Sequence, residues 1–443
     1  MHLFAYTNCS HSPVVEDAWR HPAHEQTDGV RDLSWWRGLA RDLEAGGFDG
    51  LFFADSFNVA DRYDDDYVPA LRRGEQVPEY DPLPLLTALA DATDDLGLIA
   101  TASTSFYEPY VLATKFATID ALSDGRVGWN VVTSSGRNEF ANVRGEYLDH
   151  DERYDRAEEF LAVCYALWTD SWTDDAVVRD ADADTFVDPD AVSRIDHEGE
   201  RFSVAGPFGC APTPQRAPVL FQAGQSERGR AVAARHAEVA FAFALSRDAF
   251  ADHAADLRTR AREAGRNPDD VRVCPGVTPY VAETTAAAEA ARAEVRDLVE
   301  PETGLVRLSS HLDYDYSRHA LDEPLRDVPA EGIRGVLRAF LDDDRAWTIG
   351  EAAKRYARYP VPEPAGTPAE VADELERWLA AGADGFVVMP ALVPRTLDRV
   401  TERLVPELRD RGLLAADAGG GTLRKRLFGT DEPNARHPAG RRE

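Results

Sequence analysis

Short apolar runs rich in β-branched and aromatic residues alternate along the chain with longer segments whose apolar residues recur at helical spacing. Runs of the first kind are typical of buried strands, and segments of the second kind predict amphipathic helices. The predicted strands cover residues 3–6, 50–54, 98–102, 127–133, 219–223, 239–244, 271–276 and 385–389. The predicted helices lie near 34–46, 83–94, 110–122, 151–168, 226–236, 247–264, 368–381 and 394–412.

This alternation predicts an α/β fold with a parallel sheet and crossover helices. Eight strand–helix pairs suit a closed (β/α)8 TIM barrel, and a doubly wound open sheet is the alternative that the pattern leaves open. We expect one barrel domain over residues 1–412. Residues 169–218 and 283–360 break the repeat, and we interpret both as insertions that act as a lid. The glycine-containing, polar segment 413–443 is expected to be a disordered tail.

Acidic residues outnumber basic ones by 79 to 49, which gives a formal net charge of −30. Such a surface repels nucleic acid and anionic membranes, so neither is expected as a partner. Lysine is scarce, because the lysines are only Lys115, Lys354 and Lys425. We interpret this composition as halophilic adaptation, since 1 M salt screens charges within about 3 Å. An ordinary acidic protein of a mesophile is the alternative.

The chain contains no apolar run long enough to span a bilayer, and its first residues lack the basic and apolar regions of a secretory signal. We therefore expect a soluble, cytoplasmic protein. Four scattered cysteines form no Cys-x-x-Cys pair. The sequence thus predicts neither a disulfide framework nor a metal site.

The most informative segment is residues 125–168, where a predicted strand ends in small hydroxyl residues and a predicted helix follows. The strand passes through Trp129 and Asn130 to Ser134, and the helix begins near His150. His150 and Tyr154 are four residues apart, so they share one face of the first helical turn. A helix N-terminus offers free N–H groups and a partial positive charge, which suit a phosphate group.

This segment resembles the nitrilotriacetate, dibenzothiophene-sulfone and long-chain alkane monooxygenase branch of the bacterial luciferase-like FMN-dependent monooxygenases. Five further segments resemble the same branch in the same order: Ala18–Pro22, Phe53–Ser56, Ser103–Tyr110, Gln222–Ser226 and Gly366–Ala372. The resemblance extends from residue 1 to about residue 412. It implies the TIM barrel rather than the open sheet.

The resemblance also implies the activity of a two-component flavin-dependent monooxygenase. A separate flavin reductase would supply reduced FMN, and one atom of dioxygen would go to a small organic substrate and the other to water. Branch members act on aminopolycarboxylates, sulfones, alkanes or sulfonates, so the substrate stays open, and they are dimers or tetramers, so we expect a homo-oligomer. No Gly-x-Gly-x-x-Gly follows a strand, which fits electron supply by a partner. Two alternatives remain: a deazaflavin-dependent oxidoreductase on the same barrel, and a non-catalytic flavin-binding protein.

The candidate site residues follow the carboxyl ends of predicted strands, where TIM barrels carry their active sites. By resemblance, six residues match FMN-contacting positions of the family: Asp55, Thr101, Ser134, His150, Tyr154 and Ser226. Ser103, Asn130 and Gly224 are further cofactor candidates, and His11 and His311 are the catalytic candidates. Gly224 permits close backbone approach to a phosphate, and Ser226 supplies a hydroxyl. Several candidates also have a purely structural alternative: a helix cap or ion-pair partner for Asp55, a helix cap for Ser226, a core aromatic for Tyr154, and a solvated loop residue for His150 and His311.

Overall fold

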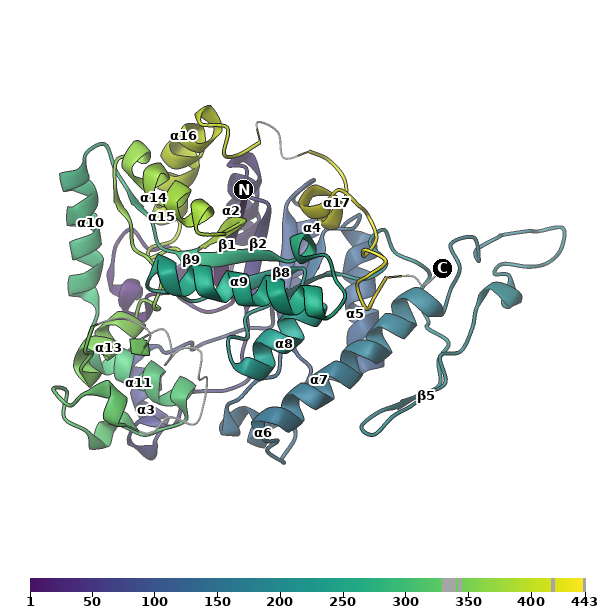
Figure 1. Cartoon of the computed structure of the whole chain (residues 1–443), viewed down its shortest axis with the longest axis horizontal. Helices are drawn as coiled ribbons and strands as arrows, with labels where there is room; N and C mark the ends of the chain where they lie inside the picture. The colour runs from purple at the N-terminus through teal and green to yellow at the C-terminus, as the bar shows by residue number, and fades with distance from the viewer. Residues whose placement is uncertain (329–339, 342–344, 416–418, 441–443) are drawn as a thin grey trace.

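The computed structural model describes residues 1–328, 340–341, 345–415 and 419–440, and its centre is a closed parallel barrel (Figure 1). Around the barrel, β1 pairs with both β2 and β12, which closes the sheet. The eight barrel strands are β1 (His2–Asn8), β2 (Gly50–Ala54), β3 (Gly97–Ser103), β4 (Val127–Val132), β7 (Val219–Gln222), β8 (Val239–Ala242), β9 (Arg272–Val277) and β12 (Gly385–Val388). They coincide with the eight predicted strands, so the TIM barrel is confirmed and the open sheet is wrong.

Both faces of the barrel strands are buried, which explains their nearly continuous apolar sequences. Phe4 and Phe52 point into the barrel, where they pack with Phe221. Their neighbours Leu3 and Leu51 belong to the outer core beneath the helices. Successive residues of one apolar strand therefore pack alternately into the barrel interior and against the surrounding helices.

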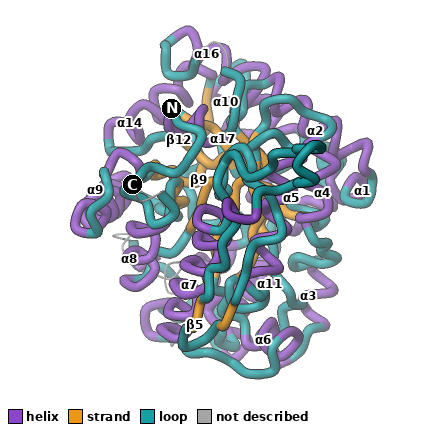
Figure 2. The backbone as a smooth tube through the Cα atoms, turned by 90° about the vertical axis from the view of Figure 1, so that its right-hand side faces the viewer, coloured by secondary structure: helices purple, strands orange, loops and turns teal. Residues whose placement is uncertain are grey.

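Helices surround the barrel on its outside (Figure 2). Those that follow the predicted pattern are α2 (Leu33–Ala45), α4 (Pro82–Ala90), α5 (Pro109–Leu122), α7 (His150–Tyr165), α8 (Glu227–His236), α9 (Arg247–Glu263) and α14 (Pro368–Ala380). The predicted helix 394–412 consists of α15 (Arg395–Arg399), the π-helical turn η8 (Val400–Leu404) and α16 (Val405–Asp410). None of the described helices has the length and apolar character that crossing a membrane requires.

The first insertion, residues 169–218, is an arm that projects beyond α5 and α7 (Figure 1). It contains the short antiparallel strands β5 (His197–Glu198) and β6 (Ser203–Val204). Its base is fixed where Trp172 Nε1 donates to the Phe208 carbonyl at 2.8 Å and the Phe208 ring packs against Tyr110. No residue of the arm lines the cavity at the carboxyl end of the barrel. The arm therefore does not contact the cavity in this structure, and its role as a lid stays a prediction.

The second insertion lies against the carboxyl end of the barrel. It carries α10 (Thr285–Leu298), α11 (Pro301–Leu312) and α13 (Ile349–Tyr356), while residues 329–339 and 342–344 of the predicted segment 283–360 lie outside the described residues. Arg307 of α11 is fully buried, pairs with Glu16, and donates to Glu75 Oε1 at 2.9 Å and to the Val14 carbonyl at 2.8 Å. This clamp fixes the insertion to the segments that follow β1 and β2.

The chain beyond residue 418 closes the opposite, amino end of the barrel with α17 (Leu423–Phe428). Leu423 and Leu427 join the interior core. Arg424 is buried and donates to Glu238 Oε1 at 2.7 Å and to the Ala217 carbonyl at 3.0 Å. The expectation of a disordered tail over 413–443 is therefore wrong for residues 419–440, and residues 416–418 and 441–443 lie outside the described residues.

Candidate active site

A cavity of about 240 Å³ opens at the carboxyl ends of the barrel strands. One part of its wall is aromatic and is formed by Tyr6, Phe52, Phe241, Phe243, Tyr356 and Tyr359. The rings of Phe243 and Tyr359 are nearly parallel, at 11°, with centroids 5.6 Å apart. An apolar wall with a few polar groups opposite is the usual form of a site for a flat aromatic ring.

Five predicted site residues line this cavity: Asp55, Thr101, Asn130, Ser134 and His311. The Thr101 hydroxyl donates to the Phe53 carbonyl at 2.8 Å, and Asn130 Nδ2 donates to Thr101 Oγ1 at 2.9 Å. These bonds leave Asn130 Oδ1 buried and without a hydrogen-bond partner in the described part of the chain. A buried acceptor without a partner is costly, and an N–H group at the edge of a flavin ring would satisfy it.

A second cluster brings four further predicted residues together where α7 and α8 begin. Ser226 is the N-cap of α8, and its Oγ accepts from the Gly229 N–H at 3.0 Å and lies 3.2 Å from His150 Nε2. A Cβ atom on Gly224 would lie 3.0 Å from the Tyr154 hydroxyl, so only glycine leaves this space open. Two helix N-termini with hydroxyl and imidazole groups between them suit a phosphate group.

Carboxyl groups without cationic partners lie beside the cavity. Burial, reinforced by Asp81, raises the pKa of Asp55 to about 8. Burial and the nearby Asp55 raise the pKa of Glu79 well above its ordinary value, although the Ser56 hydroxyl donates to Glu79 Oε2 at 2.8 Å. Neither carboxyl has an ion pair with the described residues, so no cation offsets the effect of burial on its pKa.

The two predicted catalytic histidines lie in different places. His311 lines the cavity, and its Nδ1 is 2.5 Å from the Tyr356 hydroxyl. Burial, together with Arg307, lowers the pKa of His311 to about 3, so its imidazole is neutral at neutral pH. His11 is not a lining residue, because its Nε2 lies 2.5 Å from the Gly74 carbonyl and 3.2 Å from Glu16 Oε2.

Ser103 also lies outside the cavity, and its hydroxyl oxygen accepts from the Ser105 N–H at 3.2 Å. Conversely, three tyrosines that line the cavity were not predicted from the sequence: Tyr6, Tyr356 and Tyr359. The inward alternation of β1 could have indicated Tyr6. Nothing local marks the other two tyrosines, because they lie in an insertion that follows no strand pattern.

A cavity with an aromatic wall and a polar cluster at two helix N-termini, both at the carboxyl end of a TIM barrel, are typical of flavin-binding barrel enzymes. Residues 15–385 match the family model of the luciferase-like monooxygenases. The chain therefore belongs to the luciferase-like monooxygenase family. It is accordingly an FMN-dependent monooxygenase, which is an oxidoreductase.

Several similar proteins belong to the branch of the family that the sequence resembles. The chain is 37% identical to nitrilotriacetate monooxygenase component A of Aminobacter aminovorans, over 94% of each chain. The crystal structure of long-chain alkane monooxygenase is similar with a TM-score of 0.91 and 35% identity, over 99% of this chain and 98% of that chain. The structure of a riboflavin lyase with modified FMN and riboflavin is similar with a TM-score of 0.92 and 31% identity, over 99% and 98%.

Proposed function

We propose that this chain is the oxygenase component of a two-component monooxygenase that uses reduced FMN from a separate flavin reductase. The observation that carries the proposal is the position of the phosphate cluster and the aromatic cavity at the same end of the barrel. A relative named as a component A supports a partner protein. The absence of a nicotinamide-binding motif in the sequence also fits an external source of electrons.

The proposed FMN-binding residues form two groups, one for the phosphate and one for the ring. His150, Tyr154 and Ser226 would bind the phosphate, with Gly224 leaving room for it. Asp55, Thr101, Asn130 and Ser134 would meet the polar edge of the ring. When bound, reduced FMN supplies the electrons that activate dioxygen for transfer of one oxygen atom.

The protein's own groups would orient the reactants and exclude water. The aromatic wall shields one side of the cavity from water, which would strengthen the hydrogen bonds that a bound ring makes there. Asp55 keeps its proton up to a pH of about 8, so its carboxyl can donate a hydrogen bond to a ring or an oxygen atom. His311, whose pKa is about 3, is too weak a base to take a proton at neutral pH and would instead orient a substrate through neutral hydrogen bonds.

His11 has a different role in this proposal. It lies in the layer behind the cavity, next to Glu16 of the Arg307 clamp. Arg307 in turn lies 4.7 Å from the ring centroid of Tyr359, which lines the cavity. We therefore assign His11 to positioning of the aromatic wall, while His311 contacts the substrate.

The cavity wall favours a neutral substrate over an aminopolycarboxylate. No arginine or lysine is among the described residues that line it, and its acidic members are Asp55 and Glu139. Arg137 is held elsewhere, with its Nε 2.9 Å from Asp313 Oδ2. Because a polyanion would be desolvated there without a cation, we expect a sulfide, sulfone or alkane-like substrate.

The test combines the protein with a flavin reductase, NADH, FMN and dioxygen, and follows products by mass. We expect one added oxygen atom in a neutral sulfide, sulfone or alkane, and none in nitrilotriacetate. His311→Ala should bind FMN normally but lose most product. Turnover that needs a deazaflavin, or proceeds without dioxygen, would replace this proposal with the hydride-transfer alternative.

A further inference from the structure

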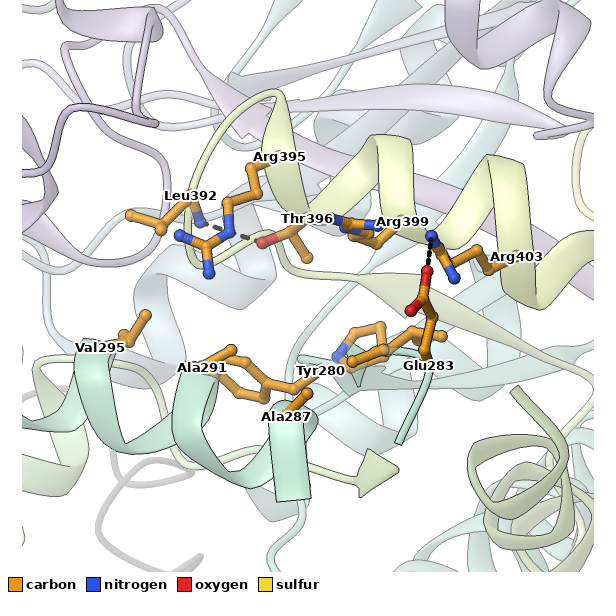
Figure 3. Close-up of a pocket in the computed structure, with 13 residues that line it drawn as sticks. Tyr280, Glu283, Ala287, Ala291, Val295, Leu392, Arg395, Thr396, Arg399 and Arg403 are labelled. Atoms are coloured by element: carbon orange, nitrogen blue, oxygen red, sulfur yellow. Dashed lines mark hydrogen bonds and ion pairs between the residues drawn. The ribbon is translucent and has the colours of Figure 1, made fainter. Parts of the chain in front are cut away.

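A second cavity, of about 350 Å³, lies between α10 and the helix formed by α15 and η8 (Figure 3). Arg395, Arg399 and Arg403 extend along one side, and α10 forms the other. No residue of this cavity lines the one at the carboxyl end of the barrel. It is therefore separate from the proposed FMN site.

The three arginines share one face of their helix because of the π-helical turn. In an α-helix, four residues overshoot a full turn by about 40°, so side chains at i, i+4 and i+8 drift around the axis. In η8, the Val405 N–H bonds to the Val400 carbonyl, five residues back, which widens the turn. The interval from Arg399 to Arg403 crosses this wider turn and cancels the drift of the first interval.

Of the three guanidinium groups, only that of Arg403 pairs with a carboxylate of the cavity wall. Arg399 makes no side-chain hydrogen bond or ion pair within the described residues. Arg403 Nη2 lies 3.1 Å from Glu283 Oε1, whose side chain is 79% exposed. Arg395 pairs at 3.1 Å with Glu294, which lies outside the cavity wall. Exposed pairs of this kind contribute at most about 1 kcal/mol, so an incoming anion can replace them.

The opposite wall is apolar. Ala287, Ala291 and Val295 of α10 line it together with the ring of Tyr280 (Figure 3). The Tyr280 hydroxyl is buried and has no hydrogen-bond partner in the described chain. Burial and the nearby Glu363 raise the pKa of Tyr280, so the hydroxyl keeps its proton. An inorganic ion would use the arginines and leave this wall uncovered.

We propose that this cavity binds a small organic anion, with a carboxylate, sulfonate or phosphate group on the arginines and an apolar body against α10. Guanidinium groups bind such anions through paired N–H donors. The volume lies within the range of small-molecule sites, roughly 300–1,000 Å³. In a chain with a net charge of −30, a cavity lined by three arginines and one carboxylate is a local reversal of the surface charge.

Calorimetric titration of the full chain with benzenesulfonate at constant ionic strength tests the proposal. Arg399→Gln should weaken binding about three- to tenfold, because it removes a guanidinium that makes no side-chain hydrogen bond or ion pair with the described residues. Ala291→Glu should abolish binding by filling the cavity with a negative charge. Arg262→Gln on α9 is the matched control, since Arg262 is exposed and likewise unpaired among the described residues. It should leave the affinity unchanged.

Three results would overturn the proposal. Equal weakening by Arg399→Gln and Arg262→Gln would show nonspecific attraction. Sulfate binding as tightly as benzenesulfonate would remove the apolar wall from the site. Loss of binding in Ser226→Ala would show that the anion occupies the FMN phosphate site. Weaker binding of sulfate and no binding of neutral benzyl alcohol are the expected results.

Discussion

Each end of the barrel buries a carboxyl group, but the pKa of that group shifts in opposite directions at the two ends. At the amino end, Glu238 is buried against Arg424, which donates to both of its oxygens at 2.7 and 3.0 Å. Burial alone would raise the pKa of Glu238, but Arg424 outweighs burial and lowers it to about 2. At the carboxyl end, Asp55 has no cationic partner, and burial raises its pKa to about 8.

This difference in pairing distinguishes a carboxylate that stabilises the fold from a carboxyl group that can take part in chemistry. A buried charge that is paired and fully hydrogen-bonded fixes a structure, whereas a buried carboxyl without a cation keeps its proton and can donate it. In TIM barrels the amino end serves stability and the carboxyl end carries the site. Here α17 completes the amino end, and the second insertion completes the carboxyl end.

The largest expected effect is at the amino end. Arg424→Met leaves Glu238 buried without its cation, so we expect the free energy of unfolding to fall by about 3–5 kcal/mol in denaturant titrations. Lys425→Met, on the exposed side of the same helix, is the control and should change it by about 0.5 kcal/mol or less. FMN affinity should stay the same in both variants. Similar losses in both would mean that α17 does not close the barrel.

The two carboxyl groups should give stability opposite dependences on pH. In the unfolded chain, Asp55 has its ordinary pKa of 3.8. In the folded protein, burial raises the pKa of Asp55 to about 8. Between these values the folded state binds more protons, so its contribution to stability falls as the pH rises, by at most about 1.4 kcal/mol per unit. Glu238 contributes fully above its ordinary pKa of 4.5, and this contribution is lost as the pH falls toward about 2.

Unfolding measured from pH 3 to 9 separates these slopes. Asp55→Asn should gain stability over the unmodified protein as the pH rises from 4 to 8. Glu238→Gln should lose the acid-dependent part below pH 4.5. Asp91→Asn, whose side chain is 80% exposed, is the control and should follow the unmodified protein. If the stability of Asp55→Asn also follows that of the unmodified protein, the Asp55 carboxyl is ionised in the folded state. The proposed difference between the two ends of the barrel would then be wrong.

A smaller effect should come from salt. If the charge of −30 reflects halophilic adaptation, the melting temperature should rise between about 0.01 M and 1 M potassium chloride. Over this range the screening length falls from about 30 Å to about 3 Å, which weakens the repulsion between acidic residues. Salt should not change the difference between Arg424→Met and the unmodified protein, because the pair is buried. A flat or falling melting temperature would remove the halophilic interpretation.

The sequence predicted the barrel well because its signal is local. Each strand is an apolar run that must be covered on both faces, as with Gly50–Ala54, where the predicted and observed bounds are the same. The tail was misjudged because its order depends on one distant pair. Arg424 and Glu238 are 186 residues apart, and a basic residue after a run of glycines gives no local sign of burial.

The same distinction applies to the site. Asp55, Thr101 and Asn130 were predictable because the strand register determines which end of the barrel they reach. Tyr359 was not, because its place depends on the Arg307 clamp, which joins α11 to Glu16 and Glu75 nearly 300 and more than 200 residues away. Contacts between an insertion and the barrel arise only in the folded chain.

The most direct test of the central claim compares the affinities for FMN and for riboflavin, which lacks the phosphate. Ser226→Ala, Tyr154→Phe and His150→Ala should each weaken FMN binding by roughly 1.5–3 kcal/mol, or about ten- to a hundredfold, and leave riboflavin binding nearly unchanged. Ser246→Ala is the matched control, because Ser246 caps α9 as Ser226 caps α8. Equal weakening of FMN and riboflavin in the three variants, or equal weakening by Ser246→Ala, would contradict a phosphate site between α7 and α8.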